Sequence, residues 1–341
     1  MVDPMAGESR RAPPLLAILS AVIVAAGVVS LMVGPAPLSA GAVFAALTGH
    51  ADPVISDIVL QIRAPRAVLA LLIGAMLGLA GAALQGLLRN PLADPAVIGT
   101  SSSAALGAVI ALYFGLAKSF PLALPLLAVA GALAGLLGLL PIARRGEGPS
   151  TLILAGVAIS ALAGAGVSLA LNLAPNPYAV SEIAFWLLGS LTDRSFQHVA
   201  LAAPLILVGA GLILWQARAL DGLALGEDAA RSLGFDLDRV QLMLVSGVAV
   251  GVGAAVAVSG AIGFVGLIAP HLVRPFTDGR PSRALAPSAL AGAALLGLAD
   301  LLVRIIPTSS ELRLGVVTAF LGAPIFITIL LRGSAGARSA R

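Results

Sequence analysis

The chain has 341 residues, of which 59% are hydrophobic and only 11% are charged. Soluble proteins carry roughly 25% charged residues, so this composition excludes a soluble enzyme, a disordered chain and a nucleic-acid-binding domain, the last because the 20 basic residues are scattered rather than clustered. The chain has no cysteine, which rules out disulfides, thiolate metal sites and cysteine nucleophiles.

Long stretches without Asp, Glu, Lys or Arg predict membrane-spanning helices. A helix needs about 20 apolar residues to cross the hydrocarbon core, and stretches such as 12–51, 119–143 and 148–181 exceed that length. They are apolar on all sides, which predicts helices rather than the alternating strands of a barrel. Dividing the stretch 240–273 at Ser259-Gly260 gives ten helices. The predicted ranges are 13–34, 66–88, 94–115, 120–142, 151–172, 198–217, 239–258, 261–276, 284–304 and 313–332.

The first predicted helix could instead be a signal peptide, because Arg10 and Arg11 precede it. Its apolar run is about 20 residues long, however, whereas the apolar core of a signal peptide has about 7–15. Nine further apolar helices follow. We therefore expect the first helix to be retained as a membrane span.

The distribution of basic residues predicts the orientation of the chain. With ten spans and a cytoplasmic N-terminus, 14 of the 20 basic residues lie inside and six outside, as the positive-inside rule requires. The sequence thus predicts an all-α polytopic membrane protein, with residues 1–341 forming a single transmembrane domain. Both termini (1–12 and 333–341) and a long loop at 218–238 are predicted to be cytoplasmic.

Several kinds of active site are missing from the sequence. No G-x-x-x-x-G-K-[ST] motif exists, and the only lysine is Lys118, so a P-loop nucleotide site is excluded. The three histidines are scattered without a metal-ligand spacing. We therefore expect no catalytic residue, no metal and no cofactor in this chain, and any ATP that it needs must be bound by another subunit.

One candidate site lies in the predicted cytoplasmic loop. Acidic residues at the start of a short segment and Arg231 near its end suit a helix dipole, and Gly234 can end the helix. Such a helix is either a plain surface helix or a docking element for a motor subunit, and the pattern alone leaves both open. The segment comprises Leu225, Gly226, Glu227, Asp228, Ala229, Ala230, Arg231, Ser232, Leu233 and Gly234.

A second candidate site lies on the predicted outer side. Arg63 and Arg66 lie at the outer end of the second predicted helix. Asp300 and Arg304 are four residues apart, so they can pair on one helix face. These arginines could simply extend to the membrane interface. All three arginines, however, lie on the outer side, where the positive-inside rule expects few basic residues. This favours a docking surface for an acidic partner. Residues 182–190 nearby predict an interfacial helix that places Trp186 at the membrane surface.

Taken together, these motifs resemble the permease family of the iron-chelate and vitamin B12 ABC importers, the type II importers. The similarity covers residues from about 55 to 332, and its motifs occur in the same order. They are residues 63–66, 85–95, 225–234, 263–274, 311–319 and 322–324.

The resemblance implies a homodimer of ten-helix subunits in the bacterial inner membrane, in contact with lipid and with a translocation path at the dimer axis. It also implies two cytoplasmic ABC ATPase subunits, which bind ATP and Mg, and a periplasmic substrate-binding protein. Residues 225–234 match the family's ATPase-coupling helices. Arg63, Arg66 and Arg304 match positions that meet glutamates of the binding protein, and Ser150-Thr151 lie near the family's cytoplasmic gate.

The expected function is therefore import of a metal chelate, with haem or a ferric siderophore placed before cobalamin. The alternative is an ion-coupled secondary transporter, which would use carboxylates inside its spans. Only Asp300 lies well inside a predicted span, and an arginine is close to it, which disfavours this alternative. Transport that persists without a proton gradient while ATP is present would distinguish the two.

Overall fold

The computed structural model describes residues 12–145, 149–306, 308 and 311–339. Every regular element among these residues is helical. The α-helices are α1 (Ala12–Met32), α2 (Ala40–Leu47), α3 (Pro53–Asp57), α4 (Ala64–Leu87), α5 (Thr100–Tyr113), α6 (Leu116–Ser119), α7 (Ala123–Arg145), α8 (Pro149–Asn172), α9 (Pro177–Leu187), α10 (Phe196–Trp215), α11 (Ala217–Ala224), α12 (Glu227–Ser232), α13 (Leu237–Ser259), α14 (Val265–Val273), α15 (Pro281–Ile305) and α16 (Leu314–Ser339). A π-helical turn, η1 (Ile58–Arg63), and two 3-10 turns, η2 (Pro95–Ile98) and η3 (Arg274–Phe276), complete the set.

Apolar helices long enough to cross a bilayer make this chain an integral membrane protein. Among the described residues, seven helical stretches meet both the length and the apolarity that a membrane span requires. Each of the ten predicted helices has a helical counterpart, but α5, α14 and the apolar part of α16 (Leu314–Thr328) are shorter than those seven. The number of ten crossings therefore stays a prediction.

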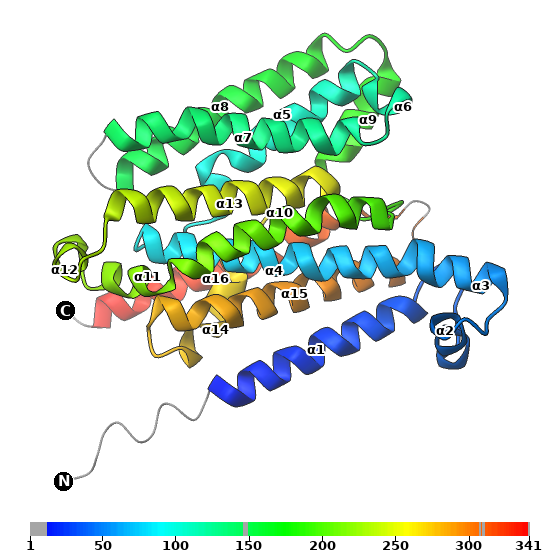
Figure 1. Ribbon diagram of the computed structural model, residues 1–341, viewed down its shortest axis with the longest axis horizontal. Coiled ribbons are helices and arrows are strands. Elements are labelled where there is room, and N and C mark those ends of the chain that lie inside the picture. Colours follow the sequence, from blue (N-terminus) through cyan, green and yellow to red (C-terminus); the bar gives the residue numbers. More distant parts are fainter. Residues whose placement is uncertain (1–11, 146–148, 307, 309–310, 340–341) are drawn as a thin grey trace.

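The helices form one elongated bundle (Figure 1). The start of α1, the short helix α12 and the end of α16 lie at one end of the bundle, and α2, α3, α6 and α9 lie at the other. We call these ends the α12 end and the α9 end. The helices α5, α7 and α8 form one side of the bundle, and α1 packs at the opposite side against α15.

Helices α4 and α15 pack against each other along much of their length. A Cβ atom at Gly74 would lie 2.3 Å from the carbonyl oxygen of Gly292, and one at Gly78 would lie 2.1 Å from that of Ser288. Small residues let two helices meet backbone to backbone, which is how helices associate tightly in lipid. These glycines therefore fix α4 against α15.

Two predicted helix starts were wrong. The second predicted helix begins at 66, whereas the helical chain runs from Pro53 through η1 into α4 without interruption. The arginines that marked its predicted start are buried inside the protein, so the helix continues through them. The third predicted helix begins at 94, whereas α5 begins at Thr100, because Pro95–Ile98 forms a 3-10 turn and Gly99 adopts a φ of +82°.

Two other predictions about local structure were confirmed. The stretch 240–273 divides where expected, since α13 ends at Ser259 and Gly260 has a φ of +71°. The short helix of the long loop is α12. A third prediction is confirmed in part: the helix predicted at 182–190 overlaps α9, which begins at Pro177 and is capped by the side chain of Asn176, while its position at the membrane interface stays a prediction.

Candidate functional site

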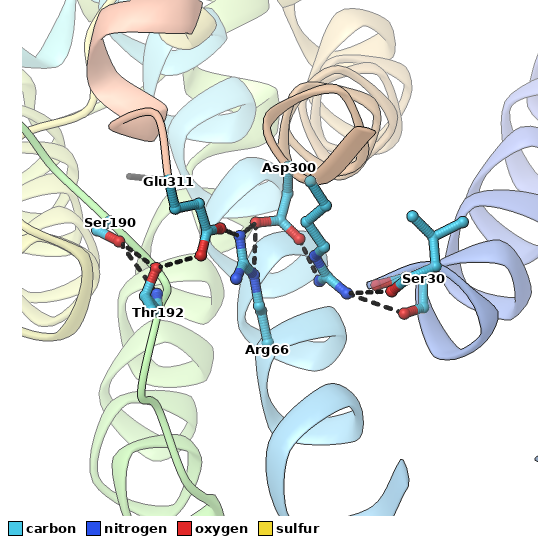
Figure 2. A network of polar contacts seen from close by, with 8 residues as sticks. Ser30, Arg66, Ser190, Thr192, Asp300 and Glu311 are labelled. Carbon is cyan, nitrogen blue, oxygen red and sulfur yellow. Dashed lines mark hydrogen bonds and ion pairs between the residues drawn. The ribbon is translucent and has the colours of Figure 1, made fainter. Parts of the chain in front are cut away.

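A cluster of charged and polar side chains joins four parts of the chain near the α9 end (Figure 2). Arg66 of α4 donates from Nε to Asp300 Oδ1 of α15 at 2.8 Å and also pairs with Glu311, which precedes α16. Asp300 pairs in addition with Arg304, one turn further along α15. The other oxygen of Glu311 accepts a hydrogen bond of 3.1 Å from Thr192, which lies between α9 and α10. We call these five residues the outer network.

The outer network is largely shielded from solvent. Asp300 is 1% exposed and Arg66 is 9% exposed. Because removing two charges from water costs several kcal/mol for each ion, such groups persist only when they are paired. Two arginines and two carboxylates balance formally here, and Arg304 also donates to the carbonyl oxygen of Ser30 at 2.9 Å. The network thus holds α1, α4, α15 and the start of α16 together.

Arg63 lies apart from the outer network. Its Nη1 donates to the carbonyl oxygens of Leu31 at 2.9 Å and Met32 at 2.7 Å, and its Nη2 donates to that of Ala36. The last carbonyls of a helix lack partners within it and carry partial negative charge. Arg63 therefore fastens the C-terminal end of α1 to the helical segment that leads into α4.

The structure confirms part of the prediction for the outer arginines. Asp300 and Arg304 pair on one face of α15 as expected. The structure brings Arg66 and Arg304 together around Asp300 but leaves Arg63 on the carbonyls of α1. All three guanidinium groups are bonded to groups of this chain, so a role in docking another protein stays a prediction and requires them to exchange partners.

Two members of the outer network, Glu311 and Thr192, were given no role from the sequence. The signal available for Glu311 was a second carboxylate, besides Asp300, close to the arginines of the predicted outer side. Burial by itself raises the pKa of Glu311, but the hydrogen bond and charge of Arg66, with the Thr192 hydroxyl, outweigh it and lower that pKa. Glu311 is therefore ionised at neutral pH. Its side chain is 31% exposed, far more than that of Asp300.

A recess of about 300 Å³ opens over the outer network. Its lining includes Gly34, Arg63, Arg66, Arg304 and Glu311. The three predicted docking arginines, though fastened to different partners, therefore border one cavity. A small acidic group entering this recess would meet all three guanidinium groups and would encounter Glu311 as its competitor.

The predicted ATPase-coupling segment lies at the α12 end. Gly226 and Gly234, which flank α12, have φ angles of +109° and +88°, conformations that glycine adopts without strain. Leu225 is 73% exposed and Leu233 is 62% exposed. Exposed leucines on either side of a short helix at the end of a bundle are suited to contact another protein. The remaining members of the segment form α12 itself.

Two polar contacts tie this end of the bundle to the closely packed helices. Asp221 of α11 accepts hydrogen bonds from the backbone N of Ser282 at 2.9 Å and from its Oγ at 2.6 Å. Ser282 lies in the first turn of α15, so Asp221 caps that helix. Glu227 of α12 lies 3.4 Å from Arg89, which follows α4. Neither contact is predictable from local sequence spacing, because each joins segments that are distant in sequence.

The remaining predicted site residues stand alone. Ser150 and Thr151 lie in the first turn of α8, and a role in a cytoplasmic gate stays a prediction. Across the described ranges 12–145, 149–306 and 311–339, no three His, Cys, Asp or Glu side chains gather in an arrangement that could hold a metal ion.

Comparisons with known proteins give a consistent result. The model of the FecCD transport family matches residues 22–332. The chain is 43% identical over 304 residues to the ABC transporter permease protein YvrB of Bacillus subtilis, covering 87% of this chain and 85% of that protein. It is 44% identical over 282 residues to the vitamin B12 import system permease protein BtuC of Vibrio cholerae, covering 81% of this chain and 83% of that one.

Two further comparisons concern metal chelates. The Fe(3+) dicitrate transport system permease protein FecD of Escherichia coli is 42% identical over 276 residues, which cover 81% of this chain and 85% of that protein. A solved structure of a metal-chelate type ABC transporter in an inward-facing conformation superposes with a TM-score of 0.82 at 31% identity. That match covers 94% of this chain and 99% of the other.

Proposed function

Because the chain belongs to the FecCD transport family and is an ABC importer permease for an iron chelate or vitamin B12, we propose that its cargo is haem or a ferric siderophore, with cobalamin as the second candidate. The match to the family model over residues 22–332 supports an importer permease of this family, and the choice among these cargoes is our proposal. In our proposal two copies form a homodimer in the bacterial inner membrane, each crossing it ten times. The α12 end faces the cytoplasm and the α9 end faces the periplasm.

The motor of the transporter is a separate subunit in this proposal. The chain contains no P-loop motif, so ATP and Mg belong to a pair of cytoplasmic ABC ATPases. These dock on residues 225–234, where Leu225 and Leu233 offer the apolar contacts. ATP binding draws the ATPases together, and the docked segment passes that motion to the helices. The permease then exchanges between two global states with different access to its path.

A periplasmic binding protein delivers the cargo at the other end. We assign its docking point to the recess over the outer network, because three arginines border it. A carboxylate of the binding protein would replace Glu311 on Arg66. Glu311 is the exchangeable partner, since its side chain is 31% exposed whereas that of Asp300 is 1% exposed.

The proposed function is tested by reconstitution. The permease, its cognate ATPase and its binding protein are placed in proteoliposomes, and uptake of haem, a ferric siderophore and cobalamin is measured. We expect uptake that needs ATP and all three components and that continues when a protonophore collapses the proton gradient. Uptake by the permease alone, or uptake abolished by the protonophore while ATP is present, would show instead an ion-coupled secondary transporter.

The proposed coupling role has its own test. Leu225→Ser/Leu233→Ser should abolish co-purification of the ATPase, because both exposed apolar contacts are lost. The control is Leu116→Ser, which changes a leucine that is 42% exposed near the α9 end. Equal recovery of the ATPase with the double variant and with the control would contradict docking at residues 225–234.

A further inference from the structure

A cavity of about 640 Å³ lies where α10 ends and α13 begins. Residues from both helices and from the segments that follow α10 and precede α13 line it. Those that matter here are Trp215, Gln216, Arg218, Asp236, Arg239 and Met243. The cavity is distinct from the coupling segment, of which only Gly234 touches it.

The cavity lies where two apolar helices long enough to span a membrane come to an end. The apolar spans Phe196–Trp215 and Leu237–Ser259 both stop at its rim. Trp215, the last residue of the first span, is 80% exposed, and tryptophan concentrates at membrane–water interfaces. With both spans in the membrane, one side of the cavity would border the hydrocarbon and the other the loop that follows α10.

The charge of the cavity is positive. Arg218 and Arg239 are both exposed, and neither forms an ion pair with a carboxylate in the part of the chain that the structure describes. The acidic lining residue, Asp236, accepts a hydrogen bond from the backbone N of Arg239 at 3.2 Å and so caps α13. Two positively charged guanidinium groups and one carboxylate thus border the cavity, so its formal net charge is positive.

A buried amide adds a hydrogen-bond donor to the cavity. Gln216 is 9% exposed, and its Nε2 donates to the Sδ atom of Met243 at 2.8 Å. A thioether is a weak acceptor, so this amide would bind an oxygen more strongly. A ligand with phosphate or ester oxygens would supply one.

We infer that this cavity binds the headgroup of an anionic phospholipid. The phosphate lies between Arg218 and Arg239, and the Gln216 amide donates to a headgroup oxygen. The acyl chains continue along α10, where Leu207 is 64% exposed and Leu214 is 47% exposed. These leucines are seven residues apart and so share one helix face. A lipid fits this site better than free phosphate, because it can place its phosphate between the arginines and its acyl chains against these leucines at the same time.

The test measures binding of phosphatidylglycerol to the purified full-length chain in detergent by native mass spectrometry. Each arginine beside an anionic headgroup contributes about 1 kcal/mol, roughly a factor of five. Arg218→Gln/Arg239→Gln should therefore weaken binding about thirty-fold. Arg218→Lys/Arg239→Lys keeps both charges and should lose no more than a few-fold, and far-UV circular dichroism shows whether each variant is folded.

The matched control is Arg274→Gln/Arg280→Gln, which removes two arginines from a basic recess of only about 70 Å³. That recess is too small for a lipid headgroup, so phosphatidylglycerol binding should be unchanged. Equal binding by wild type and Arg218→Gln/Arg239→Gln would overturn the inference. Equal affinity for phosphatidylcholine, or displacement of the lipid by millimolar inorganic phosphate, would also overturn it. None of these outcomes bears on transport by the wild-type complex, which tests the proposed function separately.

Discussion

Replacement of Asp300 by asparagine should be the most damaging single change in the outer network. Asp300 is 1% exposed and is the carboxylate that Arg304 contacts, while the side chain of Arg304 is 4% exposed. Asparagine keeps the shape but removes the charge. Breaking a buried ion pair by removing one partner costs about 3–5 kcal/mol, because the other charge stays buried without compensation. We therefore expect Asp300→Asn to lose about that much stability.

The assay is thermal or denaturant unfolding of the purified chain in detergent, with Glu311→Gln as the matched control. Glu311 is partly exposed, so its replacement should cost only about 1 kcal/mol. The double variant Asp300→Asn/Arg304→Gln removes the stranded charge and should be more stable than Asp300→Asn alone. Unfolding of Asp300→Asn and Glu311→Gln at the same midpoint would refute a stabilising role of the buried Asp300–Arg304 ion pair.

The remaining predictions concern the same framework. The folded-state pKa of Glu311 is lowered from its ordinary value of 4.5. The contribution of Glu311 to stability is therefore present above pH 4.5 and is lost as the pH falls below that value. When unfolding is measured at decreasing pH, Glu311→Gln should lose less stability than the wild type. Asp221→Ala should lower the free energy of unfolding by about 1 kcal/mol, because α15 loses its cap. Ser282→Ala should lower it little further in the double variant. Additive losses in a double-mutant cycle would contradict a shared contact between the two residues. Gly78→Leu should destabilise the chain by about 1–3 kcal/mol or more. Gly211→Leu is the control and should not destabilise it, because a Cβ atom at Gly211 would meet nothing within 4 Å. Equal unfolding midpoints of the two variants would argue against the close contact between α4 and α15.

Much of the helical framework follows from the sequence, because charge-free stretches mark the helices that lie in lipid. The break at Ser259-Gly260 was also predictable, since glycine there permits the left-handed conformation that the turn needs. The start of α4 was not. An arginine in an apolar stretch normally marks an aqueous end, but here Arg66 finds two carboxylates within the protein.

The pairing of distant residues lies beyond what the sequence shows. The i, i+4 pair Asp300–Arg304 was predictable because both residues share one helix face. Glu311 and Thr192 join them only through the fold, since 119 residues separate these two. The Asp221–Ser282 cap likewise spans 61 residues. Local spacing reveals the charged groups, whereas packing decides which of them meet.

Helix α15 is bonded at its first turn to Asp221 and at its last turns to the outer network. If both ends shift together, linkage is reciprocal: a protein that binds one face more tightly in one state must favour that state for a protein at the opposite face by the same free energy. Binding of the substrate-loaded binding protein at one end of α15 and binding of the ATPase at the other would then each change the affinity of the other, through this one helix.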